Sequence, residues 1–200
     1  MLIAVVGKAG VGKTTVLQYI ADYFHFPVFF ADRFIHQQYA NGQAGYAIVK
    51  QQFGAQFVNH EAVDRKQLAQ YVFNQPDELK RLSNLTKPLV QEWLNQLKAQ
   101  FQDKIALVEI AVMLNYWNDY RPFFDEVIQI ERDAKIVKQA LKARGVDVEQ
   151  VQKLIADPTY PILTVINNST VAECALHVTQ FLESIAKSDK CHHGHYQTPK

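Results

Sequence analysis

The sequence predicts an α/β protein in which a parallel sheet of five strands forms the middle of three layers. Three observations support this fold class. Short apolar runs rich in β-branched residues predict buried strands at 2–6, 27–32, 105–112, 126–130 and 163–166. Stretches in which apolar residues recur at helical spacing separate these runs. A glycine-rich segment directly follows the first run and leads into the first predicted helix.

This segment, residues 7–14, reads Gly-Lys-Ala-Gly-Val-Gly-Lys-Thr and fits the phosphate-binding P-loop pattern G-x-x-x-x-G-K-[ST]. Glycines let backbone N–H groups approach phosphate oxygens, and the N-terminus of the next helix adds unpaired N–H donors and a favourable dipole. A glycine turn that binds nothing is the alternative. The strand before the loop and the helix after it favour the three-layer P-loop NTPase fold.

The loop also predicts roles for side chains. Lys13 can reach the β- and γ-phosphates of a nucleotide, and the Thr14 hydroxyl can ligate Mg²⁺. We therefore expect ATP and Mg²⁺ as cofactors. The residues expected to contact the nucleotide are Gly10, Val11, Gly12, Lys13, Thr14 and Thr15.

The composition is that of an ordinary globular chain. Its 200 residues are 48% apolar, and the net charge of +1 gives no argument for nucleic-acid binding. No apolar run approaches the roughly 20 residues of a membrane helix, and we expect the N-terminal residues to form the first strand rather than a signal peptide. Cys174 in a predicted helix and Cys191 near the end make a disulfide unlikely to form. We expect a cytoplasmic monomer or weak homo-oligomer, without nucleic-acid or membrane partners.

Asp32 closes the second predicted strand. Ligands collect at the carboxyl ends of strands in open α/β sheets, so Asp32 and the loop are expected to face one crevice. A carboxylate there can accept a proton from an attacking hydroxyl or hold Mg²⁺ through water. Asp32 is equally suited to capping a helix that begins at Arg33. The residues alone leave these roles open.

Residues 33–102 contain no convincing strand and predict a helical insert. One helix is expected to end at Gly54, one to follow Asp64, one to begin at Pro76, and a longer one to begin at Pro88. The insert is far longer than a crossover connection, which needs about 10–12 residues. Its length favours a role in shaping the pocket for a second substrate.

Two other segments carry charges that could serve the site. Glu109 lies in the third predicted strand, where an acid can help to hold Mg²⁺ or can pair with a neighbouring base. Residues 132–158 include a basic helical stretch, which is either a solvated helix face or a lid over ATP. On such a lid, Arg144 is the best candidate to bind the transferring phosphoryl group, because a guanidinium suits phosphate oxygens.

The chain is predicted to be one domain over 1–187, with a flexible tail at 188–200. The last helix is expected at 171–185, with apolar residues including Leu176 facing inward. Cysteine and histidines in the tail, Cys191, His192, His193 and His195, do not have the spacing of a structural zinc site.

A P-loop does not specify a reaction. The chain has no Asn-Lys-x-Asp for guanine, which disfavours a small GTPase, and it lacks the length and acidic pair expected of a motor or oligomeric ATPase. A helical insert after the second strand and a basic segment before the fifth are the layout expected of a small-molecule or nucleotide kinase.

Within that class, the chain resembles the dephospho-coenzyme A kinases, which use Mg-ATP to phosphorylate the ribose 3′-hydroxyl of dephospho-CoA. The segments that carry the resemblance occur in one order: the loop through Thr15, Ala31-Asp32, Phe53-Gly54, Asp64-Arg65, Leu68, Val72-Phe73, residues 82–90, Ala143-Arg144 and residues 165–168. The resemblance implies that Asp32 is the general base. It also implies that Lys13 and Arg144 neutralise charge and that Arg65 and Lys87 bind dephospho-CoA.

The chain departs from the family pattern at several positions. Phe30 stands where the family has Asp, Lys87 stands where it has His, and Ala140 replaces a second lid arginine. Gly145 follows Arg144 in place of Asp, and residues 109–115 differ from the family's Asp-Ile-Pro-Leu-Leu-Phe-Glu. Two alternatives therefore stay open: another small nucleoside or nucleotide kinase, and an ATP-binding regulator without catalysis.

Overall fold

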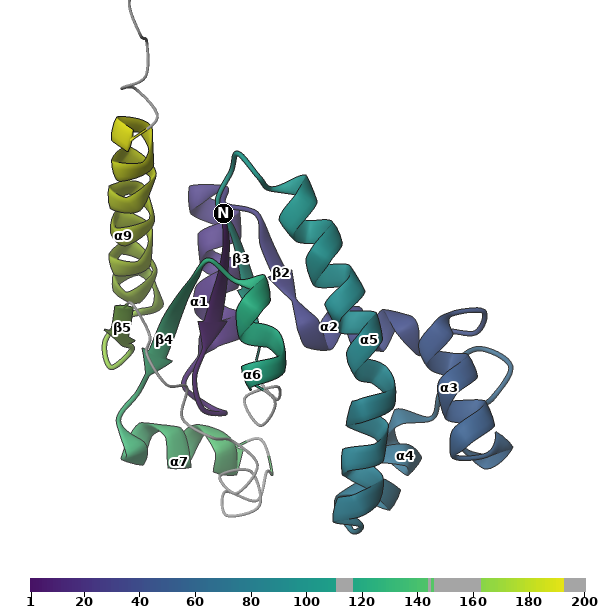
Figure 1. Ribbon diagram of the computed structural model, residues 1–200. Helices are drawn as coiled ribbons and strands as arrows, with labels where there is room; N and C mark the ends of the chain where they lie inside the picture. Colours follow the sequence, from purple (N-terminus) through teal and green to yellow (C-terminus); the bar gives the residue numbers. More distant parts are fainter. Residues whose placement is uncertain (111–116, 144, 146–162, 193–200) are drawn as a thin grey trace, which may run out of the picture. The chain divides into compact units, whose positions relative to one another are not determined.

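A computed structural model describes residues 1–110, 117–143, 145 and 163–192, with side chains as far as residue 187 (Figure 1). The chain forms two compact units. Met1–Phe29 and Phe101–Lys200 make the first, and Phe30–Gln100 make the second. The chain therefore leaves the first unit after the second strand begins and returns to it before the third.

The sheet confirms the predicted fold class. Its five strands lie in the order β2-β3-β1-β4-β5, and β1 pairs in parallel with both β3 and β4, as does β4 with β5. The strands are β1 (Leu2–Val6), β2 (Val28–Phe30), β3 (Ala106–Glu109), β4 (Glu126–Glu131) and β5 (Leu163–Ile166). Every residue of β1 and β3 is buried, which explains why both read as continuous apolar runs.

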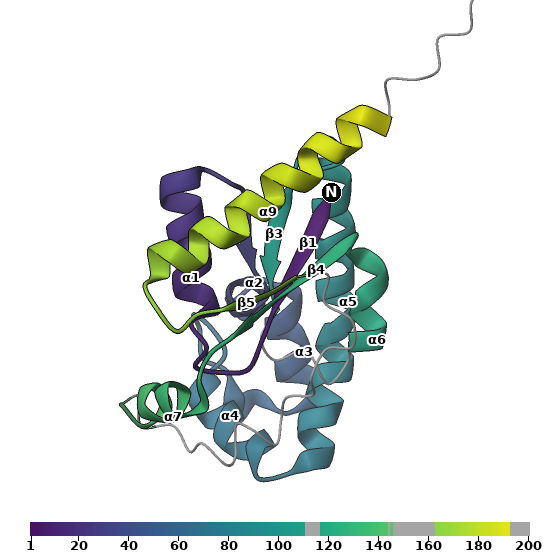
Figure 2. The same ribbon diagram turned by 90° about the vertical axis from the view of Figure 1, so that its left-hand side faces the viewer.

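Helices cover both faces of this sheet. Figure 2 shows α1 (Lys13–Tyr19) and α9 (Val171–His192) on one face and α6 (Trp117–Tyr120) on the other. Helix α1 continues as a π-helical turn, η1 (Ile20–Phe24), and ends at His25, whose φ of 57° is left-handed. After β4, the chain forms α7 (Ala134–Ala143) beyond the carboxyl ends of β1 and β4 (Figure 1). No helix in the described part of the chain is long and apolar enough to cross a membrane.

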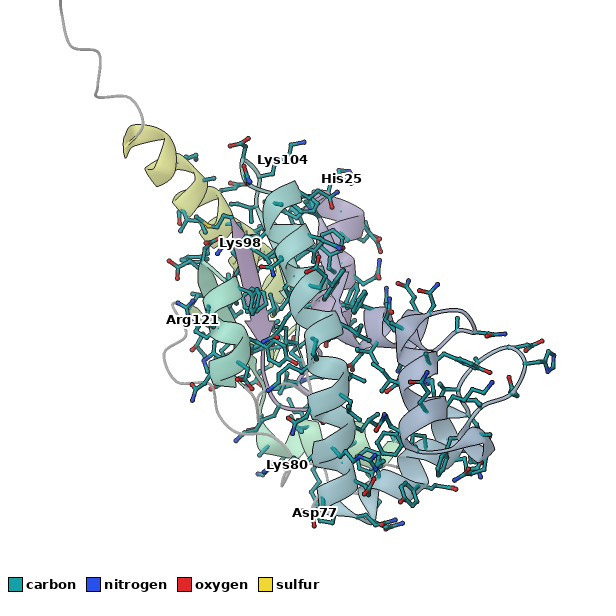
Figure 3. The ribbon with its side chains drawn as sticks, turned by 45° about the vertical axis from the view of Figure 1, so that its right-hand side comes forward. His25, Asp77, Lys80, Lys98, Lys104 and Arg121 are labelled. Carbon is teal, nitrogen blue, oxygen red and sulfur yellow. The ribbon has the colours of Figure 1, made fainter. Side chains whose placement is uncertain are left out.

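The second unit is helical, as predicted. It contains α2 (Ala31–Gln38), α3 (Ala44–Gln52), η2 (Ala55–Phe57), α4 (Arg65–Phe73) and α5 (Pro76–Gln100). In Figure 3, Asp77 and Lys80 mark the first turns of α5 and Lys98 its last turns. Asp64 caps α4 as expected, because its carboxylate accepts a hydrogen bond from Gln67 N at 3.0 Å. The core of this unit consists of Tyr39, Tyr46, Val49, Phe53, Phe57, Val63, Leu68 and Val72.

Proline 88 does not begin a helix, so the expectation of two helices here was wrong. Pro88 lies inside α5, which is 25 residues long. A proline removes one helical N–H and its ring crowds the carbonyl four residues earlier. Packing on both sides outweighs this cost: Leu82 and Leu85 pack against the core before it, and Leu94 is fully buried after it.

Other element boundaries and side-chain positions also differ from expectation. Strand β2 is only half-buried and ends two residues before Asp32, because Ala31 already begins α2. Helix α9 continues to His192, past the expected end at 185. Leu176 was expected to face inward, yet it is 43% exposed. Apolar spacing selects a helix face, but neighbouring elements decide how wide the buried stripe is.

Candidate active site

The glycine loop joins the buried end of β1 to the N-terminus of α1. Gly7 and Gly12 have φ values of 146° and 92°, which side-chain-bearing residues rarely adopt. A Cβ at Gly7 would clash with the carbonyl oxygen of Ile130, and one at Gly12 would lie 2.6 Å from Asn167 Nδ2. Glycine is therefore required at both positions by conformation and by space. The backbone stays open for phosphate oxygens.

Lys13 is held inside this loop. Its side chain is only 5% exposed, and Nζ donates hydrogen bonds to the carbonyl oxygens of Gly7 at 2.8 Å and Lys8 at 3.0 Å. These carbonyls solvate an ammonium group that burial would otherwise destabilise. The ammonium group of Lys13 therefore lies where a P-loop binds the β- and γ-phosphates of a nucleotide.

Thr14 and Glu109 meet beside the loop. The pairing of β1 with β3 sets Val5 opposite Glu109, and Thr14 Oγ1 donates to both carboxylate oxygens of Glu109 at 2.9 Å. A hydroxyl and a carboxylate are the hard oxygen donors that Mg²⁺ prefers, and Mg²⁺ fills its other positions with waters and phosphates. The donor set fits Mg²⁺. No group of three or more histidine, cysteine or acidic side chains gathers elsewhere in the described ranges to offer another metal site.

Asn167 braces the loop from the end of β5, a role that sequence reasoning missed. It is 2% exposed, and its Nδ2 donates to the Val11 carbonyl at 2.7 Å. Its backbone N–H donates to Glu131 O at 2.8 Å, and Asn168 Oδ1 accepts from Asp133 N at 2.7 Å. The only signal of a larger role was the resemblance at residues 165–168.

Asp32 lies in the second unit, in the first turn of α2. Its carboxylate is exposed. The N-cap position belongs to Phe30, so of the two roles left open for Asp32 the structure does not support the helix cap. A negative charge in the first turn is still favoured by the helix dipole. Arg33 lies over the Phe30 ring, with Cζ 3.9 Å from the ring centroid, so the aromatic side chain holds a guanidinium next to Asp32 along the chain.

Asp32 and Arg65 share an electrostatic neighbour. The pKa of His36 lies below its ordinary value, chiefly through desolvation and then through the positive charge of Arg65, while Asp32 acts in the opposite direction. Burial raises the pKa of Tyr39 to about 12, against the opposing influence of Arg65. The bridge between Ala40 and Ala62 explains why the start of α4 lies near the end of α2. Two residues expected to serve the acceptor therefore lie in one charged neighbourhood.

The remaining residues expected in the site lie on separate elements of the chain. Thr15 is exposed on α1, and Lys87 is half-buried in α5, directly before Pro88. Arg144 and residues 146–158 of the expected lid lie outside the described residues.

Comparison with known proteins decides among the kinases. The family model for dephospho-CoA kinase matches residues 1–159. The chain belongs to the dephospho-CoA kinase family. A dephospho-CoA kinase of Mycoplasma genitalium is 50% identical over 191 residues, which cover 96% of each chain. One of Vibrio vulnificus is 29% identical over 78% of this chain and 77% of its own. The resemblance seen in the sequence is thereby confirmed.

Solved structures agree on the fold. TT1252 of Thermus thermophilus matches with a TM-score of 0.73 at 18% identity, covering 92% of this chain and 96% of its own. A dephospho-CoA kinase of Campylobacter jejuni matches with a TM-score of 0.61 at 22% identity, covering 94% and 98%. As a dephospho-CoA kinase family member, the chain is a transferase that uses ATP and a small-molecule substrate.

Proposed function

We propose that this chain transfers the γ-phosphoryl group of ATP to the ribose 3′-hydroxyl of dephospho-CoA, yielding CoA and ADP. The family match over residues 1–159 carries the proposal, and the geometry of the loop supports it, with Lys13 buried among its carbonyls. Phosphoryl transfer depends mainly on positioning and on stabilising charge, and both are tasks for such a loop.

The half of the site that binds ATP, the phosphoryl donor, consists of the glycine loop and the residues around it. The backbone of residues 10–15 cradles the phosphates, and Lys13 exchanges its bonds to Gly7 and Lys8 for phosphate oxygens. Thr14 and Glu109 would hold Mg²⁺, which neutralises phosphate charge when bound. Arg144 adds a cation from the lid segment 132–158 to the transferring group.

The acceptor half is supplied by residues of the insert, 33–102, together with Asp32. Asp32 accepts the proton of the 3′-hydroxyl as its oxygen attacks the γ-phosphorus, and the bond to the ADP oxygen breaks. Arg65 and Lys87 bind the anionic groups of dephospho-CoA. The charges of Asp32 and Arg65 both act on the pKa of His36, so the two residues lie near each other. This proximity supports the proposal that both contact one substrate.

The proposal also includes the expectations about the cofactor, the location and the assembly of the protein. We propose that the activity depends on Mg²⁺ and that the protein is cytoplasmic, with no nucleic-acid or membrane partner. We further propose a monomer or weak homo-oligomer in which residues 1–187 form one kinase domain.

A coupled assay of ADP release, run with dephospho-CoA, nucleosides and nucleoside monophosphates, tests the proposal. The expected result is release that depends on dephospho-CoA, with CoA identified by mass. Faster turnover of a nucleoside or monophosphate would mean another small kinase. ATP binding with no turnover on any acceptor would mean a regulator that has lost catalysis.

A further inference from the structure

Arg132 is the first residue of the segment 132–158 and lies at the glycine loop, but its side chain has not yet been given a contact of its own. It follows β4 directly and precedes α7, at the edge of the sheet where β1 runs into the loop. Its Nη1 lies 4.0 Å from the point that a Cβ on Gly12 would occupy, and Asn167 Nδ2 lies 2.6 Å from the same point. A guanidinium and an amide therefore both border the last glycine of the loop.

The bonding of this guanidinium is incomplete. Within the described residues, Arg132 Nε is buried and has no hydrogen-bond partner. The residue as a whole is half-buried, so its other nitrogens are not all enclosed. A buried donor without a partner is unfavourable, and a guanidinium cannot relieve the cost by losing its charge. Its field reaches α9, where it opposes the burial that raises the pKa of Cys174 to about 11.

We propose that Arg132 is a second cationic contact for the nucleotide and binds the phosphate oxygens nearest Gly12. Lys13 Nζ is held at the start of the loop, by Gly7 and Lys8, whereas Arg132 approaches its last glycine. The two cations thus serve different ends of the phosphate chain.

A purely structural reading would have Arg132 fill space between the loop and α9. A structural role predicts a loss of stability when Arg132 is replaced, with no change in phosphate affinity. A phosphate-binding role predicts a loss of phosphate affinity in a variant that still folds. The two are separated by measuring binding without dephospho-CoA, so the outcome does not depend on the identity of the acceptor.

Calorimetry with MgADP and with inorganic tripolyphosphate provides the test, using Arg132→Met, Arg132→Lys and the control Lys104→Met. Lys104, labelled in Figure 3, is an exposed cation between α5 and β3, outside the segment 132–158. Losing a charge-assisted hydrogen bond should weaken both ligands by roughly 10- to 100-fold in Arg132→Met. Arg132→Lys should lose less, and Lys104→Met should bind like the wild type. Unchanged affinity in Arg132→Met, or a loss for MgADP without one for tripolyphosphate, overturns the proposal.

A measurement on the wild-type protein covers the case in which Arg132→Met does not fold. Arginine-selective labelling with phenylglyoxal, read by mass spectrometry, should be slowed at Arg132 by ADP and by tripolyphosphate but not by adenosine. Arg121, which donates to the Phe124 carbonyl and is labelled in Figure 3, serves as the reference arginine. Labelling of Arg132 at the same rate with and without ADP overturns the proposal.

Discussion

Replacing Asn167 with alanine should destabilise the glycine loop, because Asn167 holds the loop backbone in place from the end of β5. The change removes the hydrogen bond from Asn167 Nδ2 to the Val11 carbonyl, 2.7 Å long, at a residue that is 2% exposed. A buried carbonyl left without its partner costs about 1–3 kcal/mol. For a chain of this size, each kcal/mol lowers Tm by about 2–4 °C, so the expected fall is roughly 2–12 °C. Because the same bond positions the loop backbone, the affinity for ADP should also fall.

The assay is thermal unfolding of the nucleotide-free enzyme, followed by calorimetric titration with MgADP. Asn168→Ala is the matched control, because its side chain is exposed and water can replace the bond that it accepts from Asp133 N. The control should melt and bind close to the wild type. If Asn167→Ala melts with the control and binds MgADP equally well, the idea that β5 braces the loop is refuted.

Three further predictions follow. Asp32→Asn should keep MgADP affinity and lower turnover by roughly 10²–10⁴-fold, measured as ADP release, and near-normal turnover would remove Asp32 from the role of base. Burial raises the pKa of the Cys174 thiol from 9.0 to about 11, so the contribution of this thiol to stability should be full below pH 9 and should fall as pH rises to 11; Cys174→Ala should lose this fall in pH-dependent melting curves. Pro88→Ala restores a helical N–H and should raise the unfolding free energy by about 1–3 kcal/mol in urea titrations; an unchanged or lower value would contradict the prediction.

The sequence predicted those parts of the fold that depend on residues close together in the chain. The loop, its flanking strand and helix, and the limits of β5 follow from glycine spacing and apolar runs. The roles of Asn167 and Arg132 could not be predicted in this way. Asn167 contacts Val11 across 156 positions of sequence, and Arg132 reaches Gly12 from the neighbouring strand. Such contacts depend on the order of strands in the sheet, which periodicity does not encode.

Pro88 and Phe30 show two other reasons for error. Proline is a strong local stop signal, yet packing of α5 on both sides of Pro88 outweighs it. Phe30 was judged only as the loss of a family carboxylate. In the structure its ring lies against the Arg33 guanidinium, so Phe30 makes an aromatic contact with a neighbouring cation. A departure from a family pattern is therefore best judged by what the new side chain contacts.

Two side chains of the loop, Lys13 and Thr14, are hydrogen-bonded within the protein before any nucleotide binds. Lys13 Nζ is bonded to two carbonyls and the Thr14 hydroxyl to Glu109. Nucleotide binding must exchange these bonds for bonds to phosphate and Mg²⁺, so the net gain is the difference between two well-bonded states. Arg132 differs, because its buried Nε has no partner in the described chain to give up. At Nε, binding of a phosphate oxygen would therefore displace no existing hydrogen bond.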